Sequence, residues 1–456
     1  MHRITVNGKT EYVKDGTLLS SVLLKSGESV PHPCGGKGIC RKCIVSVNGR
    51  DELACRYEIH SSVDVVTENP ASIHSPTGAV TTDEKTRDMC LALDIGTTTI
   101  ALALVSADKK EIVRVITETN PQSVYGADVI SRIEHCRKNG VSDIQKILIE
   151  KINSMIKRLS VSVTDMYVSG NTVMLHILLG EDCTGMAAAP YTPVFLGKRT
   201  TDAASLGINN VSLIHTLPCI SPFVGADITA GINYIDNGKC NLLVDLGTNA
   251  EIVLIKEDSF VCTSAAAGPC FEGVSISSGM SATDGAIYSY SEGRIRTIGN
   301  SIPKGICGTG LIDIIAFLLR NSVIDENGFM ECDSYEVAED IFITQEDIRQ
   351  FQYAKSAIYS AILTLVTEEK IPLDKIENIY ISGGFSSEIN IKNAVATGLL
   401  PKEAEDRCIP VNNSSLMGTV KYIYEKKDLN KQGSHTDLSS SALFSDLFIK
   451  NMSFTI

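Results

Sequence analysis

Alternating apolar and polar positions dominate the first part of the chain, which is the pattern of half-buried strands. The alternation runs on both sides of Asn7-Gly8 and again around Asn48-Gly49. An Asn-Gly pair between alternating segments indicates a hairpin, because both residues accept the positive φ of a tight turn. An apolar stretch at helical spacing and a loop rich in Gly and Cys lie between the two hairpins. This order predicts a β-grasp, ferredoxin-like domain over residues 1–68.

The pattern changes after this domain. Residues 69–88 are rich in Pro, Ser, Thr and charge without periodicity, and we expect them to form a flexible linker. Over residues 89–426, apolar strands alternate with helical stretches, which predicts a layered α/β domain. The clearest helical stretches are 129–136, 144–159 and 354–369. Residues 427–456 are polar and Ser-rich, and we expect a weakly ordered C-terminal tail.

The composition is that of a folded protein with more than one domain. Of the 456 residues, 43% are hydrophobic and 21% are charged. The formal charge of −13 argues against a general nucleic-acid binder, since phosphate neutralisation needs clustered Lys and Arg. The first residues lack the apolar core of a signal peptide, and the best apolar run, Cys90–Val105, is interrupted by Asp94. We therefore expect a cytoplasmic protein that does not enter membranes.

Four of the 14 cysteines lie close together in the first domain and form a candidate metal site. They are Cys34, Cys40, Cys43 and Cys55. Glycines around the first three let backbone amides approach inorganic sulfide, and the second hairpin returns the chain so that Cys55 faces Cys43. The set predicts a 2Fe-2S cluster. The other ten cysteines are scattered among apolar neighbours, and we expect them to be buried thiols.

A structural zinc is the alternative for these four cysteines. Zinc sites favour two Cys-x2-Cys pairs, whereas this chain has one close pair and a loop with three glycines, which favours the cluster. The cysteines are separated by five, two and eleven residues, a departure from the plant-type spacing. These spacings define no reduction potential.

Two strand-turn-strand segments about 150 residues apart share one layout, in which an apolar strand ends in Asp before a Gly turn and a second apolar strand. Their turn residues are Asp94, Gly96, Thr97 and Thr98 in the first, and Asp245, Gly247, Thr248 and Asn249 in the second. Gly exposes backbone amides, Thr adds a hydroxyl, and Asp holds a magnesium ion through water. One copy alone would be an ordinary turn, but two copies predict related lobes that bind ATP and Mg²⁺.

A third Gly-rich turn completes the candidate nucleotide site. Gly383, Gly384 and Phe385 follow an apolar strand and precede a helix-like stretch, so that adenosine can lie against the turn. Together the three elements resemble the superfamily of sugar kinases, actin and heat-shock chaperone ATPases. That resemblance implies a two-lobed, actin-like ATPase domain built from duplicated ribonuclease H-like halves, with the nucleotide in the cleft between them.

Two further segments match the lobe-connecting helices of that superfamily. They are Val168–His176 and Gly305–Asp313. In the second, the resemblance implies that Gly308 and Thr309 contact the nucleotide. The same residues fit equally well at the start of an ordinary helix, with Asn171 or Thr309 near its N-cap.

Four acidic residues are candidates for catalysis. Asp94 and Asp245 end the two strands, while Asp227 and Glu251 lie in a Gly-flanked turn and just past a phosphate loop. The positions of Asp227 and Glu251 suit residues that orient the attacking water. Alternatively, Asp227 and Glu251 are carboxylates at a turn or a strand edge that have no catalytic role.

The combined features resemble the reductive activators of corrinoid proteins, which pair a 2Fe-2S domain with this ATPase fold. Four further segments carry the resemblance: Asn120–Ile133, Tyr191–Phe195, Pro222–Gly231 and Ser264–Gly273. It implies ATP-dependent return of an inactive Co(II) corrinoid to Co(I) for methyl transfer, with one electron passing from the cluster. The implied partners are a corrinoid protein or corrinoid-dependent methyltransferase and a low-potential electron donor, and a homodimer is compatible with the resemblance.

Three other functions fit parts of the pattern. An ATP-driven donor to another acceptor, such as a radical dehydratase, shares the ATPase fold, but activators of that class usually carry a four-iron cluster at a dimer interface. A small-molecule kinase with an attached redox domain would transfer phosphate to an acceptor instead of water. An iron-sulfur redox sensor with a nucleotide switch would show negligible turnover.

Overall fold

The structure is a computed structural model of the 456-residue chain. It describes residues 1–26, 43–67, 89–126, 128–384, 386–426 and 431–454. The expected flexible linker, residues 69–88, lies outside the described residues.

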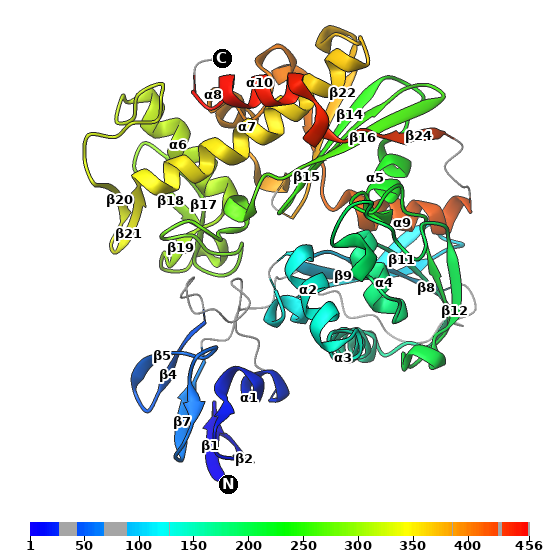
Figure 1. Cartoon of the computed structure of the whole chain (residues 1–456), viewed down its shortest axis with the longest axis vertical. Helices are drawn as coiled ribbons and strands as arrows, with labels where there is room; N and C mark the ends of the chain where they lie inside the picture. The colour runs from blue at the N-terminus through cyan, green and yellow to red at the C-terminus, as the bar shows by residue number, and fades with distance from the viewer. Residues whose placement is uncertain (27–42, 68–88, 127, 385, 427–430, 455–456) are drawn as a thin grey trace.

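In the residues that the structure describes, the first domain contains a mixed five-stranded sheet, a two-stranded sheet and the helix α1 (Figure 1). Its elements are β1 (His2–Val6), β2 (Lys9–Val13), β3 (Thr17–Leu18), α1 (Leu19–Lys25), β4 (Ile44–Val47), β5 (Arg50–Leu53), β6 (Glu58–Ile59) and β7 (Val63–Val66). The strand order is β2-β1-β7-β4-β5, with β1 parallel to β7. Both predicted hairpins form, because Val6 pairs with Lys9 and Val47 pairs with Arg50. The β-grasp prediction is therefore confirmed.

The next part of the chain forms the first lobe of a two-lobed domain. Its elements are β8 (Met89–Ile95), β9 (Thr99–Ser106), β10 (Glu111–Thr119), α2 (Val129–Asn139), α3 (Ser142–Leu159), β11 (Val163–Gly170), α4 (Thr172–Leu179), β12 (Arg199–Asp202) and β13 (Val211–Thr216). The sheet order is β10-β9-β8-β11-β13-β12. Strands β8, β9 and β10 form an antiparallel meander, and β11 and β13 continue the sheet in parallel from β8.

The second lobe repeats this arrangement. Its sheet has the order β23-β22-β14-β15-β16-β24, in which β14, β15 and β16 form the meander and β22 and β23 continue in parallel from β14. These strands are β14 (Asn241–Leu246), β15 (Ala250–Ile255), β16 (Ser259–Ala265), β22 (Asn378–Ser382), β23 (Cys408–Pro410) and β24 (Gln432–His435). The two Asp-Gly-Thr segments thus occupy equivalent strands, so the predicted duplication is confirmed.

Helices and two small sheets, β18-β17-β19 and β20-β21, complete the second lobe. They are β17 (Ala286–Ser291), β18 (Arg294–Thr297), β19 (Gly305–Ile306), α6 (Gly308–Arg320), β20 (Ser334–Ala338), β21 (Ile341–Thr344), α7 (Gln345–Glu368) and α8 (Ile391–Ala396). The long helix α7 contacts β15 and β16. It begins nine residues before the predicted start at residue 354, at a capping box made by Thr344 and Asp347.

Helices α5 (Ala226–Ile235) and α9 (Ser414–Glu425) connect the lobes. α9 contacts β8 and β11 of the first lobe, and α5 packs Ile228 and Ile232 against Leu243 and Val253 of the second. The two helices also pack on each other, so closely that a Cβ at Gly418 would lie 1.8 Å from the Ala230 carbonyl oxygen. The predicted lobe-connecting helices are therefore wrong, because α4 packs in the first lobe's core and α6 in the second's.

The expected weakly ordered tail is also wrong for residues 432–454. β24 adds a parallel strand to β16, and α10 (Ala442–Lys450) packs on α7. The ammonium group of the buried Lys355 donates to the Ser453 carbonyl, and Asn451 donates to Ser360 at 3.0 Å. Polar composition misled the prediction, because the few apolar residues of the segment, such as Leu438 and Phe454, are buried in the second lobe's core beside these polar anchors.

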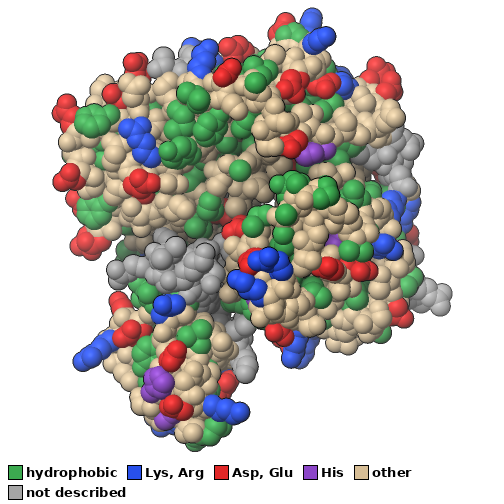
Figure 2. All heavy atoms as spheres, viewed as in Figure 1, with side chains coloured by type: hydrophobic (Ala, Val, Ile, Leu, Met, Phe, Trp, Pro, Cys, Tyr) green, Lys and Arg blue, Asp and Glu red, His purple; other side chains and the backbone are tan. Residues whose placement is uncertain are grey.

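The surface shows charged groups of both signs. On the face in Figure 2, acidic and basic side chains are interspersed over the lobes. Within the part of the chain that the structure describes, no helix has the length and apolar character needed to cross a membrane.

Candidate active site

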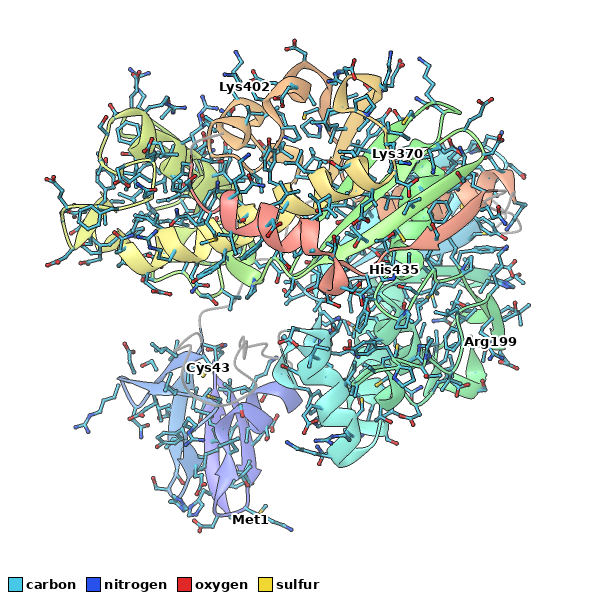
Figure 3. All side chains as sticks on the ribbon, turned by 45° about the horizontal axis from the view of Figure 1, so that its top comes forward. Met1, Cys43, Arg199, Lys370, Lys402 and His435 are labelled. Atoms are coloured by element: carbon cyan, nitrogen blue, oxygen red, sulfur yellow. The ribbon has the colours of Figure 1, made fainter. Side chains whose placement is uncertain are left out.

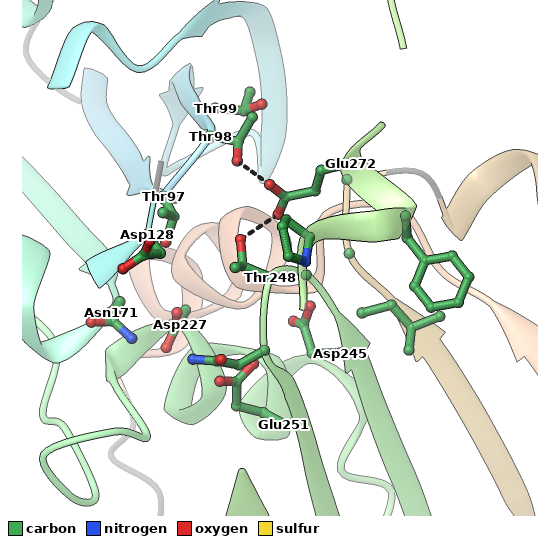
Figure 4. Close-up of a pocket in the computed structure, with 18 of the residues that line it drawn as sticks. Thr97, Thr98, Thr99, Asp128, Asn171, Asp227, Asp245, Thr248, Glu251 and Glu272 are labelled. Atoms are coloured by element: carbon green, nitrogen blue, oxygen red, sulfur yellow. Dashed lines mark hydrogen bonds between the residues drawn. The ribbon is translucent and has the colours of Figure 1, made fainter. Parts of the chain in front are cut away.

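A cleft of about 1890 Å³ lies between the two lobes. The β8–β9 turn lines it from the first lobe and the β14–β15 turn from the second (Figure 4). Of the predicted nucleotide contacts, the structure brings these to the cleft: Asp94, Gly96, Thr97, Thr98, Asp245, Gly247, Thr248, Asn249, Gly308, Gly383 and Gly384. Thr309 is instead buried in α6 beside Cys307, and Phe385 lies outside the described residues.

Asp94 is held by the start of α9. Asn413 Nδ2 donates to Asp94 Oδ2 at 2.7 Å, and Ser415 Oγ donates to Oδ1 at 2.7 Å. Burial raises the pKa of Asp94, although these hydrogen bonds act in the opposite direction. The lobe-connecting helix therefore fixes the orientation of the carboxylate near the end of β8.

The other three predicted carboxylates also face the cleft. Asp245 and Glu251 are directly paired across β14 and β15, and Asp227 lies in the first turn of α5. Burial, then repulsion from Asp245 and Asp94, raises the pKa of Asp227 to about 7. Burial, then repulsion from Asp94, raises the pKa of Asp245 to about 6, while burial raises that of Glu251 well above its usual value. Mutual repulsion of this kind favours binding of a cation between these groups.

A buried network, which the sequence analysis did not assign to the site, anchors the β8–β9 turn. Asn120 Nδ2 donates to the Gly96 carbonyl at 2.7 Å, and the Asn120 amide donates to the Thr98 carbonyl at 2.8 Å. The fully buried Arg132 donates through Nη2 to the Thr97 carbonyl at 2.5 Å.

This anchoring decides where the loop's amides point. In a trans peptide the C=O and the following N–H point in opposite directions. The carbonyls of residues 96–98 point toward Asn120 and Arg132. The next three N–H groups, those of residues 97–99, therefore point away from this network. Backbone N–H groups that are exposed in this way bind phosphate in Gly-rich loops. Both Asn120 and Arg132 belong to a segment that carried the family resemblance, but only the fold shows what they hold.

Glu272 is a second site residue without a predicted role. It ends the short η5 helix (Pro269–Glu272) and lines the cleft. Thr98 Oγ1 donates to its Oε2 at 2.9 Å, and Thr248 Oγ1 donates to its Oε1 at 2.8 Å. One carboxylate thus joins the β8–β9 turn of the first lobe to the β14–β15 turn of the second (Figure 4).

The C-terminal segment also reaches the cleft. His435, Thr436, Asp437 and Ser439 are among its lining residues, and Figure 3 shows His435 at the junction of the lobes. Thr436 donates its amide to the Cys262 carbonyl at 2.9 Å. The sequence analysis missed these residues because it treated residues 427–456 as a weakly ordered tail.

The Gly-rich turn after β22 meets the β14 strand closely. Gly383 has φ of +115°, and a Cβ there would lie 2.0 Å from the Leu246 carbonyl oxygen. Only glycine fits this approach, which places the turn against the end of the strand that carries Asp245.

Two of the predicted cluster ligands can be described. Cys43 and Cys55 are both buried in the core of the first domain, and the Ala54 amide donates to the Cys43 carbonyl at 2.9 Å. The hairpin thus places Ala54 opposite Cys43, and Cys55 lies one residue beyond the facing position that the sequence predicted for it. Cys43 lies at the opposite end of the domain from Met1 (Figure 3). Cys34 and Cys40 lie outside the described residues.

Family models match the chain along most of its length. Residues 1–70 match a 2Fe-2S iron-sulfur cluster binding domain. Residues 89–237 match the RACo middle region, and residues 239–456 match the C-terminal domain of RACo, the ASKHA domain.

Two curated relatives and one solved structure cover similar extents. The chain is 28% identical to the corrinoid activation enzyme RamQ of Eubacterium limosum, over 97% of each chain. It is 26% identical to a Co(II) methylated amine-specific corrinoid protein reductase of Methanosarcina barkeri, over 80% of this chain and 76% of the relative. A solved reductive activator for a corrinoid, iron-sulfur protein matches 99% of this chain and 98% of its own with a TM-score of 0.72 at 25% identity.

Proposed function

Because the chain belongs to the family of reductive activators of corrinoid proteins, we propose that it uses ATP to reduce a Co(II) corrinoid protein to the Co(I) state. One observation carries this proposal. A cysteine-bearing 2Fe-2S domain and a duplicated two-lobed cleft occur in one chain that aligns over 97% of its length with a corrinoid activation enzyme.

The cleft is the proposed ATP site. The amides of the anchored β8–β9 turn, with the hydroxyls of Thr98 and Thr248, are suited to the phosphates. We assign Asp94 and Asp245 to hold Mg²⁺ through water, because they end equivalent strands of the two lobes and their charges repel in its absence. Asp227 and Glu251 remain the candidates for orienting the attacking water.

The first domain is the proposed cluster site. Cys34, Cys40, Cys43 and Cys55 would hold a 2Fe-2S cluster, and the burial of Cys43 and Cys55 in one core, at the same end of the second hairpin, fits two of its thiolate ligands. When bound, this cluster supplies one-electron transfer. An external low-potential donor would restore the electron after each event.

ATP acts here through the relative position of the lobes. The β8–β9 and β14–β15 turns, which are the first and second proposed phosphate loops, belong to different lobes. Helices α5 and α9 pack on each other between the sheets. Binding one triphosphate to both loops therefore constrains the angle between the lobes. We propose that this change alters the affinity for the corrinoid partner, and that hydrolysis of the bound ATP drives the otherwise unfavourable reduction.

Partner-dependent hydrolysis tests this function. The purified protein, with its cluster assembled anaerobically, should hydrolyse MgATP faster with a Co(II) corrinoid protein than with the same protein in the methylated Co(III) state. The variant D245N should abolish this stimulated hydrolysis, and C55S should abolish reduction. Equal hydrolysis with either corrinoid state would contradict the proposal and favour an unrelated acceptor.

A further inference from the structure

Glu272 makes a contact that spans the cleft. It lies in the second lobe and accepts a hydrogen bond from Thr248 of the same lobe at 2.8 Å and from Thr98 of the first lobe at 2.9 Å. The carboxylate lies over the second phosphate loop, since its Oε1 is 4.0 Å from the point where a Cβ on Gly247 would stand. Figure 4 shows it between the two loops.

The two threonines cannot serve Glu272 and a nucleotide at once. Each threonine hydroxyl has a single hydrogen to donate. An ionised phosphate oxygen has none, so it binds a hydroxyl only by accepting that hydrogen. Both hydroxyl donors that the proposed function assigns to phosphate, besides the backbone amides, therefore bind one carboxylate instead.

The charge of Glu272 adds to this exclusion. A carboxylate between the phosphate loops repels a triphosphate at short range. Burial raises the pKa of Glu272, while the hydrogen bonds from Thr248 and Thr98 and the charge of Arg132 act in the opposite direction. The Arg132 guanidinium already donates to the Thr97, Gly126 and Gln122 oxygens. Glu272 thus lacks a dedicated ion-pair partner in these interactions.

We propose that Glu272 is an internal competitor of the nucleotide phosphates, which bridges the two lobes and is displaced when ATP takes its two threonine donors. This inference rests on the proposed function. Nucleotide binding would then directly break the pair of hydrogen bonds by which Glu272 links the two lobes. The glycines on both sides of η5, Gly268 and Gly273, have φ of 76° and 75°, a conformation that other residues rarely adopt.

Nucleotide affinity tests the competition. Titration calorimetry with a non-hydrolysable ATP analogue and Mg²⁺ should show about tenfold tighter binding by E272Q than by the wild type, because two hydrogen bonds to a charged acceptor no longer have to be broken. The matched control E331Q, which removes an exposed carboxylate elsewhere in the second lobe, should bind like the wild type.

Two further readouts separate competition from a structural role. Hydrogen exchange of the segments around Thr98 and Thr248 should be faster in E272Q than in the wild type without nucleotide, and equal once the analogue is bound. The variant E272D keeps the charge but is too short to span both hydroxyls, so it should also bind more tightly than the wild type, and it decides the question if E272Q does not fold.

Unchanged or weaker binding by the folded variants would overturn the inference, and loss of hydrolysis without tighter binding would make Glu272 catalytic instead. Failure of the wild-type protein to bind the analogue would be a different result, because it would remove the proposed ATP site itself. The two failures are therefore distinguishable in one set of titrations.

Discussion

Asn413 donates a 2.7 Å hydrogen bond from Nδ2 to Oδ2 of Asp94, a residue 319 positions earlier in the chain. The same side chain accepts the Leu416 amide through Oδ1 and so caps α9. One amide therefore joins the start of the lobe-connecting helix to the first phosphate loop. Through this contact, a movement of α9 is transmitted to the carboxylate proposed to hold Mg²⁺.

Removing this amide should weaken nucleotide binding. In N413A, Asp94 loses one of its two tethers and α9 loses its cap, so we expect the free energy of unfolding to fall by about 2–3 kcal/mol and the affinity for MgATP to fall about tenfold. The control N390A removes a cap from α8 without touching the cleft, and should cost about 1 kcal/mol with unchanged affinity. Denaturant titration and calorimetry measure both. Equal affinities for the two variants would contradict the role of the Asn413 contact.

Arg132 should control affinity without contacting the nucleotide. Burial lowers its pKa to about 10, so it stays cationic at neutral pH, and its planar fork reaches several acceptors at once. R132K keeps the charge but loses the fork, so the KM for ATP should rise about tenfold while kcat changes less.

The exposed Arg137 on the same helix provides the control. Its guanidinium pairs with Glu134 at the surface, so R137K should leave KM unchanged. R132M should raise KM further than R132K, because it removes the charge as well. Equal KM values for R132K and the wild type would show that the loop does not depend on this anchor.

The pH should change stability and hydrolysis in opposite directions. The pKa values of Asp227 and Asp245 are raised above 3.8 to about 7 and about 6, so the fold favours their protonated forms. Their stabilising contribution is complete below about pH 4 and is lost as the pH rises through 6 and 7. Without nucleotide, the Tm should therefore fall between pH 5 and pH 8, whereas hydrolysis should rise because it needs the carboxylates ionised.

Neutralising Asp227 isolates this effect. At pH 8, D227N should melt roughly 2 °C or more above the wild type in magnesium-free buffer, and the difference should vanish at pH 5. D374N, which changes an exposed aspartate, should show no such pH dependence. A D227N variant that melts with the wild type at pH 8 would refute the repulsion among the cleft carboxylates.

The helix crossing between the lobes should tolerate no added volume. A Cβ at Gly418 would overlap the Ala230 carbonyl oxygen at 1.8 Å, so G418A must push α5 and α9 apart. We expect a loss of about 1–3 kcal/mol in stability and slower hydrolysis. G197A places the same methyl group in open space and should behave like the wild type in both thermal melting and hydrolysis.

The sequence allowed the duplicated fold to be predicted because its strongest signals are local. Asn7-Gly8 and Asn48-Gly49 specify hairpins, and the Asp-Gly-Thr turns follow buried strands whose apolar runs mark the centre of each sheet. Most cleft residues of the two turns were found for the same reason. A turn needs particular residues within a few positions, and such a pattern is readable without a fold.

The remaining site residues depend on contacts between distant segments. Glu272 meets Thr98 from 174 positions away, and Asn413 meets Asp94 from 319. No local pattern encodes these separations. The lobe-connecting helices were misplaced because capped helix starts look alike in sequence, whereas connection is a property of packing. β24 was missed because a short, polar edge strand lacks apolar alternation.

The most direct test of the account is the ATP dependence of cobalt reduction by a single chain. With the cluster reduced in advance and excess donor removed, the absorbance of Co(I) should appear in a Co(II) corrinoid protein after MgATP is added. It should not appear with the non-hydrolysable analogue, nor with D245N, whose cluster remains reduced. Formation of Co(I) at the same rate without nucleotide would contradict the coupling of the cleft to electron transfer.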